Sequence, residues 1–227
     1  MLDPQLDFVV LPVDQYCHDW MHAFFIRGVF NITTYLFMVA CKAAGVSELY
    51  ERLREYVALW SLPRGGCISG RNLSTIFNKG RETANVKAKA FKCQASEALS
   101  VIPIMYVFAM KVIIPMGVVA REACTAFVRM CDLIWCIQAA VSGHASPDAL
   151  RQRTNQFLDA CEAAGWQEYM TPKYHWLIHF PRHLQQFKTL LSCFVHERKH
   201  KMAKRYCNDI LQLEASERSV LFEVTCQ

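Results

Sequence analysis

The feature that most constrains the fold of this 227-residue chain is an apolar run in its middle. The 20 residues from Val101 to Ala120, VIPIMYVFAMKVIIPMGVVA, contain a single charge, Lys111. A run of this length is either a buried core helix or a membrane span. A lysine at the centre of a spanning helix costs about 2.5–3.5 kcal/mol on insertion scales, and two prolines interrupt the run. We therefore expect a core helix, and an integral membrane protein around 101–120 is the alternative.

The rest of the chain reads as a series of helices with recognisable start and stop signals. One long apolar helix is predicted from near Asp19 to Gly45. Another is predicted from Ser146, with Pro147 in its first turn, to a stop at Gly165. A third begins near Pro172, and Pro181 is predicted to break it.

Hydrophobic residues make up 53% of the chain and charged residues 20%, which excludes a disordered protein. The predicted class is mainly α with few or no strands. We divide the chain into an extended lead-in or strand (1–18), a helical region (19–165), C-terminal helices (166–213) and a tail (214–227).

The net charge of +5 is unevenly distributed. Two segments are rich in cations, one from Arg64 to Lys92 and one from Arg182 to Arg205, and each contains a single acidic residue, Glu82 and Glu197 respectively. Basic segments on a weakly basic protein suit contact with nucleic-acid phosphates. Two solvated helix faces are the alternative interpretation.

The 11 cysteines are scattered singly, without a C-x-x-C pair, mostly within apolar stretches. This pattern indicates reduced core residues rather than a disulfide framework. The acidic N-terminal sequence MLDPQLDF has neither the basic nor the apolar region of a signal peptide. We therefore expect a nuclear or cytoplasmic location.

The stretch HERKH, His196 to His200, matches the H-E-x-x-H signature of zinc proteases. However, Arg198 and Lys199 would place two positive charges beside the zinc ion. Upstream, three further histidines are spaced four residues apart, on one helical face except that Pro181 intervenes. A metal triad and a packed aromatic cluster are both open interpretations of these residues: His175, His179 and His183.

Two motifs become informative when taken in order. CHDWMHAFFIRGVF contains a D-x-x-H motif with Met before the His, and TPKYHWLIHFPRHLQQFKTLLSCFVHERKH contains P-K-x-H-x-x-x-H and then E-x-x-H. With about 150 residues between them, and with the middle segment FKCQASEAL, this order resembles the C-terminal half of eukaryotic CACTA-type DDE transposases. These enzymes belong to the ribonuclease-H-like superfamily.

The resemblance implies a role for each matching residue. In this family a glutamate on a helix after a large helical insertion holds Mg²⁺ or Mn²⁺. Glu197 matches the position of that glutamate. The remaining motif residues match Asp19, His22, His175, His179 and His200. The nearby cations would hold DNA phosphates: Arg198, Lys199, Lys201, Lys204 and Arg205.

The family's other two catalytic aspartates lie upstream of D-x-x-H, and only 18 residues precede Asp19 in this sequence. His196 also stands where the family has Phe. We therefore expect a catalytically incomplete remnant that is not an enzyme as it stands. Its partners would be DNA and the missing N-terminal half or a related protein, with no small-molecule substrate evident. A helical interaction module without catalytic function is the alternative.

Overall fold

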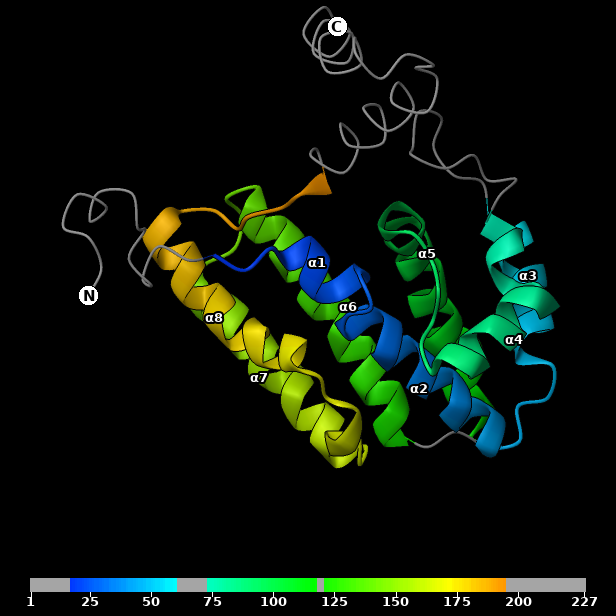
Figure 1. Ribbon diagram of the computed structural model, residues 1–227. Coiled ribbons are helices and arrows are strands. Elements are labelled where there is room, and N and C mark those ends of the chain that lie inside the picture. Colours follow the sequence, from blue (N-terminus) through cyan, green and yellow to red (C-terminus); the bar gives the residue numbers. More distant parts are fainter. Residues whose placement is uncertain (1–16, 61–72, 118–120, 195–227) are drawn as a thin grey trace, which may run out of the picture. The chain divides into compact units, whose positions relative to one another are not determined.

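The computed structural model describes residues 17–60, 73–117 and 121–194, and all regular structure in these ranges is helical (Figure 1). The predicted mainly α class is confirmed. The chain divides into two compact units, Met1–Leu191 and Ser192–Gln227. Most of the predicted lead-in lies outside the described residues, and so do residues 195–227, which include Glu197.

Eight α-helices are found in the described ranges. They are α1 (Trp20–Phe25), α2 (Val29–Ala43), α3 (Leu49–Ala58), α4 (Lys79–Ala88), α5 (Ala95–Phe108), α6 (Arg121–Val141), α7 (Pro147–Ala163) and α8 (Pro172–Phe187). Short 3₁₀ helices cover Leu73–Phe77 and Gln167–Tyr169, and α5 continues into a π-helical turn, Ala109–Ile113, and a 3₁₀ turn, Ile114–Met116.

The long helix α6 organises the packing of the first unit. It packs against α7, α2 and α5, and α8 lies beside α7 (Figure 1). The interface between α2 and α6 is centred on Phe37 and Phe127, whose rings stack with centroids 4.4 Å apart. Both rings are fully buried, and burial of such a side chain contributes about 1.5–3 kcal/mol.

The predicted long helix from Asp19 to Gly45 is wrong in one respect, because the structure contains two helices there. The chain leaves α1 at Ile26, takes a left-handed conformation at Arg27 (φ 49°), and starts α2 after Gly28. The backbone of Gly28 folds against the end of α1. A Cβ atom there would lie 2.7 Å from the carbonyl oxygen of Phe24 and closer still to that of Ala23. Only glycine fits this turn.

The predicted break at Pro181 is also wrong, since α8 continues through it to Phe187. A proline inside a helix removes one backbone hydrogen bond and costs about 3 kcal/mol. Here Pro181 is buried, as are Phe180 and Leu184 on the same helix. Core packing offsets the local cost, and the histidines on either side of Pro181 stay on one continuous helix.

The end signals predicted for the helix after Ser146 are confirmed. The Ser146 hydroxyl accepts a hydrogen bond from the amide of Ala149 (3.1 Å), and Pro147 is the first helical residue. Gly165 follows the helix with a φ of 71°, a conformation that glycine adopts without strain. These signals act through neighbouring residues, so the helix ends that they predict do not depend on tertiary contacts.

Several cysteines fill space between the helices. Cys41, Cys131 and Cys161 are buried, unbridged thiols on α2, α6 and α7. Burial raises the pKa of all three, that of Cys161 to about 12. At neutral pH they are protonated and act as small apolar side chains.

The apolar run at 101–120 is only partly buried. Its first half packs in the core with Val101, Met105 and Phe108, whereas Ile114 and Met116 beyond it are 44% and 40% exposed. Within the described ranges, three helical stretches are long and apolar enough to cross a membrane, by length and composition alone: Trp20–Ala43, Ala95–Met116 and Arg121–Val141.

We predict that Gly28→Ala lowers the free energy of unfolding by about 3 kcal/mol, as expected when a methyl group is forced into a filled space. Urea denaturation measures the loss. The matched control is Gly80→Ala on α4, where the added methyl group meets only the side-chain oxygen of Asn78, at 3.3 Å. Equal losses for the two variants would contradict this account of the turn.

Candidate functional site at the junction of α1 and α8

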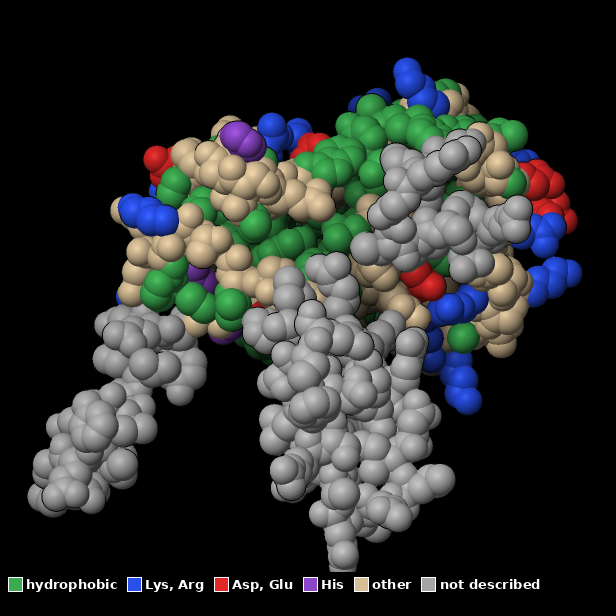
Figure 2. Space-filling view, turned by 90° about the horizontal axis from the view of Figure 1, so that it is seen from above, with side chains coloured by type: hydrophobic (Ala, Val, Ile, Leu, Met, Phe, Trp, Pro, Cys, Tyr) green, Lys and Arg blue, Asp and Glu red, His purple; other side chains and the backbone are tan. Residues whose placement is uncertain are grey.

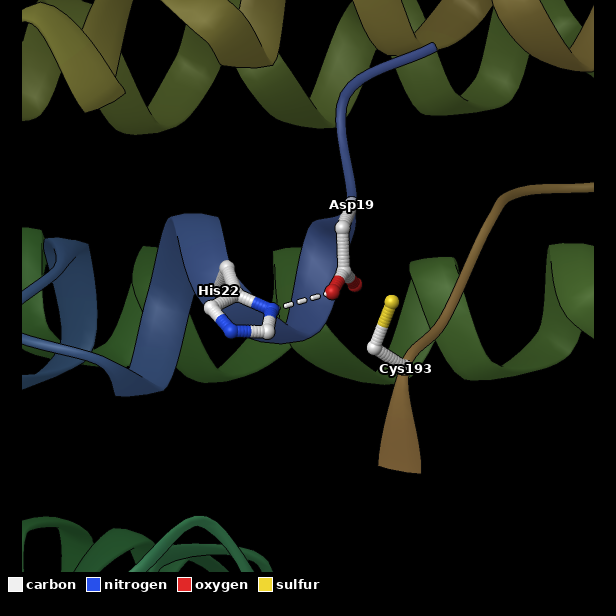
Figure 3. Close-up of side chains that lie close together, drawn as sticks. All are labelled: Asp19, His22 and Cys193. Carbon is white, nitrogen blue, oxygen red and sulfur yellow. Dashed lines mark hydrogen bonds and ion pairs between the residues drawn. The ribbon is translucent and has the colours of Figure 1, made fainter. Parts of the chain in front are cut away.

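The D-x-x-H motif forms the start of α1. Asp19 is the N-cap residue, and its carboxylate accepts a hydrogen bond from the amide of Met21 (2.9 Å). The other carboxylate oxygen pairs with Nδ1 of His22, one turn into the helix (Figure 3). The Asp19 side chain is 10% exposed, so it is largely enclosed by these contacts. The motif therefore fixes where α1 begins and how the His22 ring is oriented.

The end of α1 is held by a residue of the second motif, Lys173, in the first turn of α8. Its ammonium donates hydrogen bonds to the carbonyl oxygens of His22 (3.0 Å) and Ile26. The carbonyl end of a helix carries partial negative charge, which a cation stabilises. The ammonium also lies over the Trp176 ring, 5.9 Å from its centroid, and partial burial lowers the Lys173 pKa.

Further contacts join the same two parts of the chain. The buried hydroxyls of Thr33 on α2 and Tyr174 on α8 are hydrogen-bonded at 2.9 Å. The His18 ring stacks on Trp176, with centroids 4.8 Å apart and planes 5° from parallel. Two motifs separated by about 150 residues are thus one structural unit.

The histidines of the second motif form a cluster of their own. On α8, Nε2 of His175 and Nε2 of His179 are 3.2 Å apart. His183 follows one turn later and is 8% exposed. His18 lies against this row, with its ring centroid 5.6 Å from that of His179. The sequence indicated three of these histidines, but not His18, which joins them only through the fold.

A second site is a basic groove of about 810 Å³ beside the α1–α2 turn. Four cations line it, and no carboxylate is among its lining residues in the described part of the chain: Arg27, Arg81, Lys89 and Lys92. Three belong to the basic segment noted in the sequence. Arg27 comes from the α1–α2 turn, and no sequence signal connects it with the others.

Buried asparagines fix the loop that carries Lys92. The side-chain amide of Asn31 donates to the carbonyl oxygen of Phe91 (2.8 Å), and the Asn85 side chain accepts from the amide of Lys92 (2.8 Å). Arg81 donates to the Lys92 carbonyl oxygen (3.1 Å). The cations of the groove therefore project from a backbone that is held in place.

Four of the predicted motif residues lie in the described part of the chain, as two separate pairs: Asp19 with His22 at the start of α1, and His175 with His179 on α8. The other predicted site residues lie outside the described residues: Glu197, His200, Arg198, Lys199, Lys201, Lys204 and Arg205. The Mg²⁺ or Mn²⁺ site and the alternative zinc site at His196 and His200 thus stay predictions.

Comparison of the chain with family models, curated proteins and solved structures finds no match.

We predict that Lys173→Met lowers the free energy of unfolding by about 2 kcal/mol, because two carbonyl groups of α1 lose a charged donor while the aliphatic stem is kept. Chemical denaturation of the full chain measures the change. Lys87→Met, at an exposed position on α4, is the control and should shift stability by less than about 0.5 kcal/mol. A Lys173 variant as stable as the control would show that the cap is unimportant.

Proposed function

We propose that this chain is a transposon-derived protein corresponding to the C-terminal part of a CACTA-type DDE transposase. It is catalytically incomplete and contacts DNA. The observation that carries the proposal is the junction of α1 and α8, where Lys173 of one motif caps the helix that begins at Asp19 of the other. Contact between the two motifs is expected if they belong to one site.

In this proposal the described helices are the insertion that separates the family's second aspartate from its glutamate. Only nine residues separate the end of α8 at Phe187 from Glu197. Glu197 would be the remaining carboxylate ligand for Mg²⁺ or Mn²⁺, hard ions that prefer oxygen ligands. The two missing aspartates would come from an N-terminal half or from a related protein.

The basic groove supports contact with DNA. The four lining cations favour a positive potential in the groove, and each phosphate they neutralise releases condensed counterions. The cations near Glu197 would extend the same interaction along the chain. Binding of this kind is weak, independent of sequence and strongly dependent on salt.

We predict that the purified chain binds duplex DNA with an affinity that falls steeply between 50 and 200 mM salt, and that the K89N/K92Q variant reduces the salt slope by about 1–2. Asparagine tolerates the left-handed backbone at position 89, where φ is 49°. Fluorescence anisotropy measures both affinity and slope.

The control for the groove is K79Q/K87Q, which removes two cations of the adjoining helix α4 at positions that do not line the groove. The K199A/K201A variant tests the terminal segment in the same way. Equal losses for K89N/K92Q and the control would argue against the groove. A natural chain without salt-dependent binding would leave the helical interaction module as the better interpretation.

The proposal also predicts that the chain alone neither nicks DNA nor transfers strands with Mg²⁺ or Mn²⁺. Supercoiled plasmid and transposon-end duplexes are the substrates for the assay. Metal-dependent activity that is abolished by Glu197→Gln would overturn the expected incompleteness and show a complete active site.

One observation favours a different function, that of an integral membrane protein around 101–120. In the helical stretch Ala95–Met116, only 39% of the 18 most apolar consecutive residues are buried. Met110, Ile114 and Met116 are exposed. Hydrophobic side chains cover a wide area of the face shown in Figure 2. Alkaline carbonate extraction of the expressed protein separates the functions, since a spanning protein stays in the membrane pellet.

A further inference from the structure

The imidazoles on α8 lie on one helix face because the helix continues through Pro181. Residues four apart in a helix are neighbours on its surface. The ring centroids of His175 and His179 are 4.9 Å apart, and those of His179 and His183 are 6.3 Å apart. His18, from the segment before α1, lies 5.5 Å from His183. Four imidazoles from two distant parts of the sequence are thus gathered in one place.

The first two of these rings are spaced as two ligands of one metal ion. Their Nε2 atoms are 3.2 Å apart. A tetrahedral zinc ion with Zn–N distances of about 2.0–2.1 Å holds its nitrogens about 3.3–3.4 Å apart. We propose that His175 and His179 chelate a divalent transition-metal ion of the zinc class at the surface of α8. His175 is exposed, so water can complete the coordination.

A second, independent observation lies beside this pair. His183 is 8% exposed, and its Nδ1 has no hydrogen-bond partner among the described residues. Buried polar atoms without partners are rare in proteins, and they commonly mark an ion or ordered water. A hydrated metal ion next to this ring would supply the missing polar contact.

The donor atoms of this pair indicate the class of metal. Neutral imidazole is a good ligand for Zn²⁺, Cu²⁺ and Ni²⁺, whereas Mg²⁺ prefers oxygen. The site is thus distinct from the Mg²⁺ site proposed at Glu197 and does not depend on it.

The competing explanation is a simple hydrogen bond, in which one neutral ring donates its Nε2 proton to the other. That arrangement gives the same nitrogen–nitrogen distance. It predicts no gain from metal, because a cation would have to break the bond. Metal binding by the purified protein distinguishes the two explanations.

The experiment titrates Zn²⁺ into the full chain at pH 7 by calorimetry. It uses an H196Q/H200Q parent, because these two histidines are also four residues apart in the sequence and could bind Zn²⁺ themselves. Introducing H175Q/H179Q into this parent should reduce the stoichiometry by one Zn²⁺ ion per chain. Adding H144Q, at an exposed histidine between α6 and α7, should change nothing. An unchanged stoichiometry in the H175Q/H179Q variant would overturn the proposal.

Thiols also bind Zn²⁺, so a site-resolved measurement accompanies the titration. Diethyl pyrocarbonate labelling with peptide mapping should show His175 and His179 protected at least tenfold by Zn²⁺, with His144 unaffected. The single variant H175Q alters only an exposed side chain, so it keeps the fold and should weaken binding at least tenfold. Labelling at both histidines that is insensitive to Zn²⁺ would exclude the chelate whatever the folding state of the double variant.

Discussion

The ammonium of Lys173 ties the beginning of this unit to its last described helix. α1 has only six residues and ends in a turn that leaves its carbonyl groups without a following helical turn to pair with. Lys173 supplies the donors for two of them from the far end of the unit. Because the same residue lies in the first turn of α8, the cap also fixes where the rings of Trp176 and the histidines lie relative to His18.

Local signals in the sequence predicted the class and several helix ends correctly. Ser146 and Gly165 act through their own backbone and nearest neighbours, so their effect is visible without tertiary structure. The break at Gly28 depends on a close approach to the backbone of Ala23 and Phe24, and an apolar pattern does not reveal such an approach. The continuity at Pro181 was mispredicted because the local preference of proline was given more weight than its burial in α8. Periodicity indicates which face is apolar, but it does not reveal what will press against it.

The sites show the same division. The contact between Asp19 and His22 could be predicted from the sequence because the two residues are only three apart. In the structure the pair forms the start of α1. The basic groove needed Arg27, and the imidazole cluster needed His18, each brought in from far along the chain. The fold thus provides two chemically different surfaces, a groove lined by four cations and a row of imidazoles.

The buried cysteines have a consequence for following the motions of this protein. Cys41, Cys131 and Cys161 stand on three different helices, and each is protonated and shielded while the helices are packed. A thiol-specific reagent can modify them only when the surrounding helix opens. The labelling rate of each cysteine therefore reports the local opening of its own helix, α2, α6 or α7, without any engineered probe.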